Sequence, residues 1–439
     1  MMPSKSQTYA EAYVWIWLPG EVKPVVAGKL TQENKSLVFN YGQSYLEREN
    51  KISIYEPELP LKSGALALSN NLTIPGCIRD GSPDAWGRRV LINKKYGAKG
   101  SVIDQYQLDE LTFLLESGSD RIGALDFQLS PTEYKPRLAQ NSVLEELIES
   151  AERVEKGIPL TEELDQALFH GSPIGGARPK ALIEDTKKNK KYIAKFSSGT
   201  DLYSVIKAEF IAMRLAQMAG LEVANVLLEK SSNKDVLLIE RFDRIKSAKS
   251  WQRKNMVSAL TIFELNEMQA MYASYETLAE IIRHKFYDAS KTLLELYKRL
   301  VVNILVGNND DHARNHAAFW DGKMLRLTPA YDICPQPRTG QTATQAMFIH
   351  GNNRMSELKE CINSAAQFQL SKKEATTIIE NLADSLVNNW KNLCDEAELF
   401  QIDRKLFGAN QFFNPFAFDS LDGDSAYLKK LEKKFRGLI

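Results

Sequence analysis

One polar stretch in the last third of the chain decides how the rest is interpreted: Val306-Gly307-Asn308-Asn309-Asp310-Asp311-His312-Ala313-Arg314-Asn315. The run from Leu293 to Val306 before it is apolar at the spacing of a buried helix, and Ser290 is the predicted cap of that helix. Two short β-like pieces, 316–320 and 324–327, follow, with an Asp-Gly pair between them. Such a pair between apolar runs is a strong hairpin signal. The stretch therefore predicts a helix, a polar loop and a hairpin in succession.

The hairpin leads to Asp332, so three oxygen-bearing side chains, those of Asp310, Asn315 and Asp332, are predicted to converge. Phosphoryl transfer from ATP needs such a set, with one carboxylate to accept the proton of the attacking hydroxyl and an Asn and a second Asp to hold Mg²⁺. Mg²⁺ takes hard oxygen ligands and usually only one or two from protein. The Asp-x4-Asn pattern is short, and a polar loop before an ordinary hairpin explains it equally well.

Two upstream features add the phosphate-binding parts of a kinase. The stretch 171–180 contains Gly175, Gly176 and Ala177 between predicted strands, where main-chain amides can approach phosphate oxygens. Lys195 lies in an apolar strand after these glycines, where a kinase places the lysine that pairs with the phosphates. A tight turn and a solvent-facing lysine on an edge strand are the plain structural alternatives.

The helix predicted from about Leu202 to Gly220 carries Glu209, in the place where a kinase helix offers a carboxylate to that lysine. A solvated carboxylate on a helix face is the alternative. Two predicted strands, 223–228 and 236–239, then lead into Glu240-Arg241-Phe242-Asp243-Arg244. This is the position of a connector between two lobes, where adenine is bound by main-chain hydrogen bonds. Each part is modest alone, but their order along the chain is that of a kinase.

Composition narrows the class of protein. The chain has 439 residues, 44% hydrophobic and 26% charged, with 56 basic and 56 acidic side chains that cancel, so DNA contact needs a local patch or a partner. The scattered cysteines form no CxxC pair, which argues against zinc and for a reducing compartment. No apolar run reaches about 18 residues, and the polar start from Met1 to Ala10 lacks a secretion signal, so we expect a cytoplasmic protein without membrane contact.

The pattern of elements divides the chain into three pieces. Residues 1–130 are predicted to form a small α+β domain, with strands in 11–41 and a helix beginning near Pro83. Residues 131–439 are the predicted kinase-like domain, in which 131–240 form the nucleotide-binding lobe and 241–439 the helical catalytic lobe. In the last piece, a basic helix predicted from Ala426 to Phe435 is read as a solvated helical end rather than as a nucleic-acid contact.

Several runs in this chain resemble the HipA family, the serine/threonine kinase toxins of bacterial toxin–antitoxin systems. The resemblance covers nearly the whole chain and is carried by Gly175-Gly176-Ala177-Arg178-Pro179-Lys180, Glu240-Arg241-Phe242-Asp243-Arg244, Asp311-His312-Ala313-Arg314-Asn315 and Thr328-Pro329-Ala330-Tyr331-Asp332-Ile333. It implies an α/β (α+β) fold: a bilobal, protein-kinase-like domain with a small N-terminal α+β domain and a mostly helical C-terminal lobe.

The same resemblance implies roles for particular residues. Asp310 is the expected catalytic base, Asn315 and Asp332 the expected Mg²⁺ ligands, and Lys195 the partner of the ATP phosphates. Glu240 to Phe242 are expected to bind adenine. Asp243 is expected near the ribose, and His312 and Tyr331 near the nucleotide.

The resemblance also implies partners. Family members usually pair with a small helix-turn-helix antitoxin, HipB-like, that binds operator DNA, so DNA contact is expected mainly through the antitoxin. Some members phosphorylate an aminoacyl-tRNA synthetase, which arrests translation.

The chain departs from the family pattern at three places. Asp332 is followed by Ile-Cys rather than the Phe-Gly of eukaryotic protein kinases, and Asp311 places a second carboxylate beside the expected base. The family's autophosphorylated serine is replaced by Pro173, so the neighbouring Ser172 becomes the candidate for phosphorylation, with a simple turn residue as the alternative.

Two other functions fit parts of the pattern. A small-molecule kinase of the aminoglycoside or choline type shares Asp-x4-Asn and a later Asp, but not the Gly-Gly-Ala-Arg-Pro-Lys run. A catalytically silent co-repressor, which binds an antitoxin and DNA, does not require the complete catalytic set.

Overall fold

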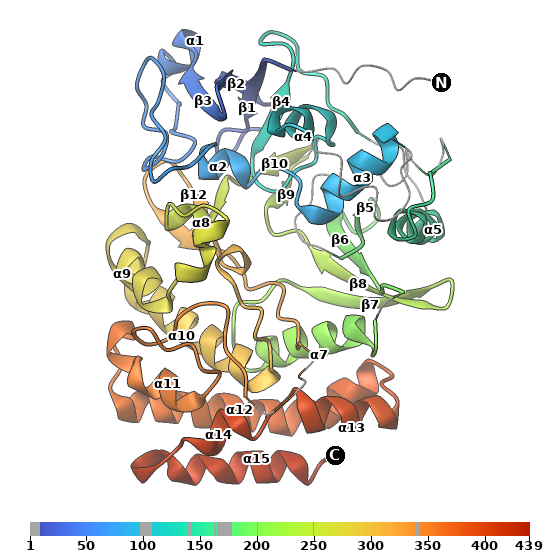
Figure 1. Cartoon of the computed structure of the whole chain (residues 1–439), viewed down its shortest axis with the longest axis vertical. Helices are drawn as coiled ribbons and strands as arrows, with labels where there is room; N and C mark the ends of the chain where they lie inside the picture. Colours follow the sequence, from blue (N-terminus) through green and yellow to red (C-terminus); the bar gives the residue numbers. More distant parts are fainter. Residues whose placement is uncertain are drawn as a thin grey trace. The chain divides into compact units, whose positions relative to one another are not determined.

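The computed structural model of the chain describes residues 9–96, 108–138, 143–161, 164, 178–199, 201–248, 250–336, 338, 340 and 342–439. Helices and strands are mixed along these residues (Figure 1), as the α+β prediction requires. The chain forms two compact units. The first comprises 1–200, 229–257 and 319–323, and the second comprises 201–228, 258–318 and 324–439.

The first unit opens with an antiparallel sheet in the order β3-β2-β1-β4, which confirms the strands predicted within 11–41. Alternate residues such as Val14, Phe39 and Phe127 are fully buried, as expected for strands with one face on a core. Gly28 has no room for a side chain, because a Cβ there lies 2.1 Å from the carbonyl oxygen of Asn40. The strands are β1 (Glu11–Ile16), β2 (Val25–Glu33), β3 (Ser36–Tyr41) and β4 (Leu125–Gln128).

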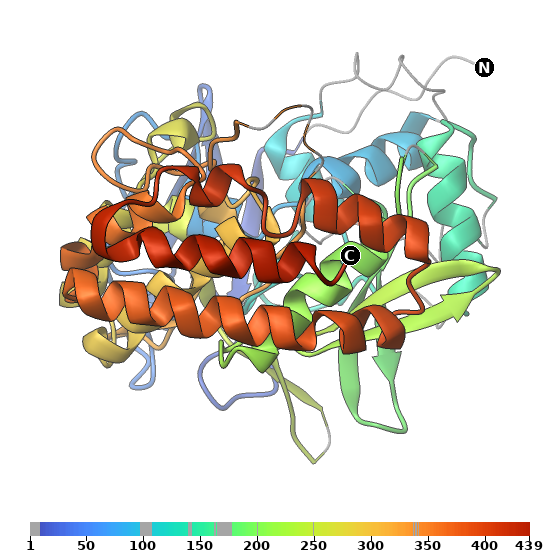
Figure 2. The ribbon, with the colours of Figure 1, turned by 90° about the horizontal axis from the view of Figure 1, so that it is seen from below.

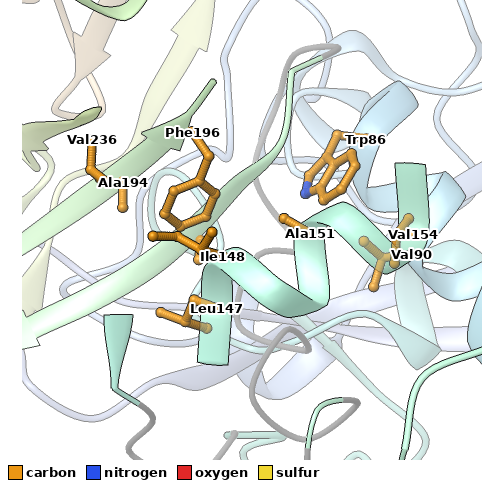
Figure 3. Close-up of a cluster of buried hydrophobic side chains, with 10 residues drawn as sticks. Trp86, Val90, Leu147, Ile148, Ala151, Val154, Ala194, Phe196 and Val236 are labelled. Atoms are coloured by element: carbon orange, nitrogen blue, oxygen red, sulfur yellow. The ribbon is translucent and has the colours of Figure 1, made fainter. Parts of the chain in front are cut away.

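A second sheet, in the order β5-β6-β8-β7, carries the predicted lysine strand and the two strands after it. Figure 3 shows its buried core, where Phe196 of this sheet lies among side chains of two helices, including Trp86 and Ile148. The indole Nε1 of Trp86 also donates to the carbonyl oxygen of Lys180 at 3.1 Å. The elements are α3 (Ala85–Tyr96), α5 (Leu144–Glu155), β5 (Lys180–Asp185), β6 (Lys190–Phe196), β7 (Val226–Ser231) and β8 (Lys234–Glu240).

A buried ionic cluster joins residues 118–123 to the predicted connector. Arg241 donates to Asp120 Oδ1 at 3.0 Å and to Asp243 Oδ2 at 2.8 Å. Arg244 donates to the same two carboxylates, and the amide of Gly123 donates to Asp243 Oδ2 at 2.8 Å. The compact units divide the chain differently from the predicted pieces 1–130, 131–240 and 241–439, because these ion pairs join the first piece to the start of the third, and the Trp86 core joins the first piece to the second.

The second unit is mainly helical and confirms the buried helix predicted before the polar stretch. That helix is α10 (Ala289–Val306), and its whole last turn is buried. The predicted cap is corrected from Ser290 to Asp288, whose carboxylate accepts from the amide of Lys291 and whose left-handed backbone places Ser290 inside the helix. The long helix α12 (Lys372–Glu396) starts with a Ser371–Glu374 capping box.

Helix α12 contacts α7 (Val205–Met218), α10 and α15 (Lys429–Arg436); Figures 1 and 2 show α12 running alongside α7 and α15. The basic residues of α15 face acidic ones of α12, since Lys430 pairs with Glu380 at 3.1 Å and Lys434 with Asp384 at 2.8 Å. These pairs agree with the prediction of a solvated helical end.

The predicted hairpin is present as β12 (Ala317–Trp320) and β13 (Leu325–Leu327). Gly322 in its turn has a φ of 98°, which suits glycine. The hairpin tip belongs to the first unit, where the indole of Trp320 donates to the carbonyl oxygen of Ser53 at 3.0 Å.

The remaining elements connect these parts. Within the described ranges no helix is both long and apolar enough to cross a membrane. All four cysteines are buried, and none of them forms a disulfide. The other elements are α1 (Gln43–Leu46), α2 (Gly76–Arg79), α4 (Glu110–Glu116), β9 (Arg244–Lys246), β10 (Trp251–Arg253), β11 (Met256–Ser258), α8 (Ala259–Ile262), η3 (Met268–Tyr272), α9 (Tyr275–Lys285), η4 (Ala313–Asn315), α11 (Leu358–Asn363), η5 (Ala365–Phe368), α13 (Gln401–Asn410), α14 (Phe416–Asp419) and η6 (Gly423–Leu428).

Candidate active site

The polar loop starts where α10 stops at Gly307. This glycine has a φ of 74°, and a Cβ on it lies 2.5 Å from the carbonyl oxygen of Gln411, so no other residue fits without displacing the main chain. Asn308 continues the helix cap, with its amide donating to the carbonyl oxygen of Asn303 at 2.8 Å. The side chain of Gln345 donates to the carbonyl oxygen of Asn308 at 3.0 Å. The loop is thus anchored at its first residues by main-chain geometry.

The loop closes on itself between Asp310 and Asn315. The amide of His312 donates to the carbonyl oxygen of Asp310 at 2.8 Å, and the amide of Asn315 donates to that of His312 at 2.8 Å. The side-chain Nδ2 of Asn315 also donates to the carbonyl oxygen of Asp310, at 3.1 Å. We call residues 310–315 the catalytic loop. A direct hydrogen bond therefore joins Asp310 and Asn315, the two predicted catalytic residues at the ends of this loop.

The carboxyl of Asp310 is exposed, yet the surrounding protein alters its protonation. Partial desolvation raises the pKa of Asp310, the charge of His312 lowers it, and the charge of Asp332 raises it, with a net rise. Asp332 is thus close enough to Asp310 for their charges to interact, and the convergence of both with the side-chain oxygen of Asn315 stays a prediction. A carboxyl with a raised pKa is a stronger base for a substrate hydroxyl.

Asp332 has an unusual backbone. Its φ of 59° lies in the left-handed region, which costs a non-glycine residue of order 1–3 kcal/mol and persists only when the surroundings impose it. Its carbonyl oxygen accepts from the amide of Cys334 at 3.0 Å and from Nδ2 of Asn308 at 3.4 Å. Nearby, the hydroxyl of Tyr331 donates to the carbonyl oxygen of Arg314 at 2.7 Å, which ties the segment before Asp332 to the catalytic loop.

The second carboxylate in the loop, Asp311, has a different environment from Asp310. Asp311 is 2% exposed. Its Oδ1 lies 3.0 Å from Nε2 of His316, and its Oδ2 accepts a hydrogen bond from the hydroxyl of Tyr275. The two adjacent carboxylates thus differ in burial. The Asp311 carboxylate is buried and paired, whereas the Asp310 carboxylate is exposed.

The predicted nucleotide-binding residues of the first unit lie on its second sheet and at its end. Lys195 is 7% exposed on β6, directly opposite Lys180 of β5. Glu240 ends β8, and its Oε2 lies 2.5 Å from Nζ of Lys190. The ring of Phe242 packs edge-on against that of Phe319 at 6.0 Å.

Glu209 is fully buried on α7, in the second unit. Its pairing with Lys195 remains a prediction. His312, the third residue of the catalytic loop, is half-buried.

The structure changes the expectation for Asp243. The side chain is 2% exposed, and both carboxylate oxygens accept hydrogen bonds from Arg241, with Arg244 and Gly123 adding two more to Oδ2. Burial opposes ionisation of this carboxyl, but Arg241 and Arg244 lower its pKa to about 2. The carboxylate is therefore committed to the buried ionic cluster rather than to a ribose hydroxyl.

Ser172, Gly175, Gly176 and Ala177 lie outside the described residues. Among the residues that are described, no three His, Cys, Asp or Glu side chains form a metal-binding group. The candidate Mg²⁺ ligands are instead one carboxylate, Asp332, and one amide oxygen, that of Asn315. Such hard oxygen donors fit Mg²⁺, which completes its shell with water and substrate phosphates.

Sequence reasoning missed two polar groups, one in each unit. Asp120 was assigned no role, although the Arg-Phe-Asp-Arg run signals a dense ionic cluster that needs a further carboxylate. Tyr275 was missed because it lies 36 residues before Asp311, and no local pattern reports such a contact.

Two family models match the chain in sequence order. The HipA N-terminal domain matches residues 16–128, and the HipA-like C-terminal domain matches residues 172–390. Both models fall on the segments that hold the features described above.

Curated relatives match over part of their length. The serine/threonine-protein kinase toxin HipA of Shewanella oneidensis is 24% identical over 191 residues, covering 38% of this chain and 44% of the relative. A protein of Sinorhizobium fredii that carries a provisional name as a kinase, Y4mE, is 27% identical over 153 residues, covering 33% of this chain and 34% of the relative. The matches thus span between a third and a half of these relatives.

One solved structure resembles the chain over nearly its whole length. A chain of the Shewanella oneidensis complex of HipA, HipB and operator DNA superposes with a TM-score of 0.62 at 16% identity, covering 97% of this chain and 96% of that one. At this identity the likeness shows the fold alone, which is the bilobal α+β fold of HipA kinases.

Proposed function

The chain belongs to the HipA family, and we propose that it is an ATP- and Mg²⁺-dependent serine/threonine protein kinase, the toxin of a HipBA-type toxin–antitoxin system. The observation that supports the proposal is the hydrogen bond from Asn315 to the carbonyl oxygen of Asp310, together with the electrostatic interaction between Asp310 and Asp332. An exposed carboxyl with a raised pKa beside two oxygen donors for a metal suits the transfer of phosphate to a hydroxyl.

In this proposal, each predicted site residue of the second unit has a role. Asp310 accepts the proton of the attacking serine or threonine hydroxyl. The side-chain oxygens of Asn315 and Asp332 hold Mg²⁺, which neutralises phosphate charge when it is bound. His312 and Tyr331 lie close to the nucleotide, and Glu209 supports the lysine that pairs with the phosphates.

The residues of the first unit bind the nucleotide. Lys195 pairs with the phosphates, and the main-chain amides of 175–177 approach their oxygens. The connector from Glu240 to Phe242 accepts adenine, and the buried cluster around Asp243 fixes its backbone. Ser172, beside the glycine run, is the proposed autophosphorylation site.

The proposed partners follow from the family. The structural relative is a complex with HipB and operator DNA, and we extend this to a small helix-turn-helix antitoxin that carries this chain to DNA. The proposed substrate is a protein, with an aminoacyl-tRNA synthetase as the first candidate, and the proposed location is the cytoplasm.

The experiment that tests the proposal is incubation of the pure protein with ATP and Mg²⁺, followed by intact-mass measurement and peptide mapping. Asp310→Asn removes the base without changing the size of the side chain and should abolish the phosphate adduct. Asp424→Asn is the matched control, because Asp424 is an exposed aspartate in η6. An adduct on the wild type and on Asp424→Asn alone supports the kinase, and mapping tests Ser172.

If the wild-type protein neither binds ATP nor transfers phosphate, the result contradicts the proposal and favours a role in binding the antitoxin. Transfer to aminoglycosides or choline, without transfer to any protein, favours the small-molecule kinase. These outcomes separate the three functions that the sequence left open.

A further inference from the structure

We propose that Tyr275 and His316 are positioning residues, which hold the side chain of Asp311 and thereby orient the catalytic loop for phosphoryl transfer. The inference rests on the proposed function. It adds two residues that lie outside the loop itself and assigns a role to the second carboxylate.

The three side chains form one buried group within the second unit. Tyr275, Asp311 and His316 are 0%, 2% and 2% exposed. The hydroxyl of Tyr275 donates to Asp311 Oδ2 and lies 3.3 Å from Nε2 of His316, which in turn lies 3.0 Å from Asp311 Oδ1. Each carboxylate oxygen therefore has its own partner. A buried carboxylate persists only when it is paired in this way.

The group clamps the catalytic loop at both ends. Asp311 directly follows Asp310, and His316 directly follows Asn315, so the two buried side chains flank the two proposed catalytic ones. Tyr275 comes from the first turn of a different element, α9, whose own start is fixed by the Ser274 cap and by a hydrogen bond from the Tyr275 amide to the carbonyl oxygen of Phe348 at 2.9 Å. The loop is thus tied to a rigid helix end.

This arrangement explains how Asp310 can be exposed and still well placed. Because Asp311 directly follows Asp310, holding the Asp311 side chain in the interior also fixes the main chain from which the exposed Asp310 side chain projects. Displacing a catalytic group by about 1 Å can lower the rate roughly 100-fold. A loop that is held at both ends should therefore keep Asp310 in place, and the rate high, better than a loop held only by its own hydrogen bonds. The clamp acts through position and contributes no proton.

The first test is Tyr275→Phe, which removes one hydroxyl and keeps the ring. Its matched control is Tyr297→Phe, because Tyr297 is also 0% exposed in the second unit but its hydroxyl has no hydrogen-bond partner among the described residues. We expect kcat for phosphoryl transfer to fall at least tenfold in Tyr275→Phe with the KM for ATP unchanged within about twofold. Tyr297→Phe should keep both constants.

A second pair of variants distinguishes loss of the contact with Asp311 from a general loss of structure. His316→Gln can retain a donor near the position of Nε2, whereas His316→Ala cannot. We expect His316→Gln to recover most of the kcat that His316→Ala loses. Wild-type kcat in both Tyr275→Phe and His316→Ala, with circular dichroism showing the native fold, overturns the proposal.

Hydrogen exchange of the main-chain amides in residues 307–316 gives a readout that does not depend on activity. Faster exchange in Tyr275→Phe than in Tyr297→Phe supports the clamp, and equal exchange contradicts it. A wild type that transfers no phosphate contradicts the proposed function instead, and the exchange comparison then still decides whether the clamp exists.

Discussion

The side-chain amide of Asn315 donates a hydrogen bond to the main-chain carbonyl oxygen of Asp310 at 3.1 Å, so the proposed metal ligand also closes the loop that presents the proposed base. In the proposed function, one residue therefore couples metal binding to the position of the base. Nδ2 of Asn315 holds the loop, and Oδ1 is the atom that we propose as the metal ligand.

Replacing Asn315 should therefore remove both functions at once. We expect Asn315→Ala to lower kcat by roughly 100-fold or more, the cost of displacing a catalytic group by about 1 Å, and to raise the Mg²⁺ concentration that gives the half-maximal rate. Steady-state kinetics at several Mg²⁺ concentrations measure both effects. Asn410→Ala, at the end of α13, is a suitable control, and a fully active Asn315→Ala contradicts the assignment.

The pH dependence of stability should carry a contribution from Glu58. Its buried carboxyl accepts from the amides of Gly76 and Cys77, and burial raises its pKa to about 7, opposed by these hydrogen bonds. Because the folded pKa lies above the unfolded one, this stabilisation is full below about pH 4.3 and is lost as the pH rises through 7, by roughly 3 kcal/mol.

Denaturant unfolding at pH 4.5 and pH 7.5 tests this contribution. We expect the difference in unfolding free energy between the two pH values to change in Glu58→Gln, with stability declining less toward pH 7.5 than in the wild type. Glu56→Gln, an exposed neighbour, should keep the wild-type difference. An identical difference in all three proteins contradicts the prediction.

The buried cluster around Asp120 should dominate the stability of the first unit. Burial opposes ionisation of Asp120, but Arg241, Arg244 and Lys191 hold its pKa well below its usual range. We expect Asp120→Asn to lower the free energy of unfolding by about 3–5 kcal/mol, because it leaves two buried guanidinium groups short of a negative charge.

Equilibrium denaturation measures this loss. The comparison variant is Glu133→Gln, which breaks the solvent-exposed pair with Lys135 at 2.9 Å and should change stability by less than about 1 kcal/mol. Similar effects from the two variants argue against a special role for the cluster.

Gly307 should tolerate no side chain at the start of the catalytic loop. Both Gly307 and Gly423 have a positive φ, but a Cβ on Gly307 meets the carbonyl oxygen of Gln411 at 2.5 Å, whereas nothing lies within 4 Å of one on Gly423. We expect Gly423→Ala to cost about 1–2 kcal/mol of stability from its backbone alone. Gly307→Ala should cost at least about 1 kcal/mol more because of overpacking. Thermal and denaturant unfolding of both variants measure the difference.

The sequence by itself determined the elements whose signals are local. The spacing of apolar residues predicted α10, and the Asp-Gly pair predicted the β12–β13 hairpin, without knowledge of any other part of the chain. These predictions succeeded because helix periodicity and turn chemistry depend on residues only a few positions apart.

Only the tertiary structure decided which of two adjacent carboxylates is open. Asp310 and Asp311 are the same residue type in the same loop, and they differ because Tyr275, far away in sequence, lies against one of them. In the same way, Arg241 and Asp120 commit Asp243 to the interior and join the N-terminal residues to the connector. Burial and ion pairing are set by contacts between distant segments, and no local pattern of residue types contains that information.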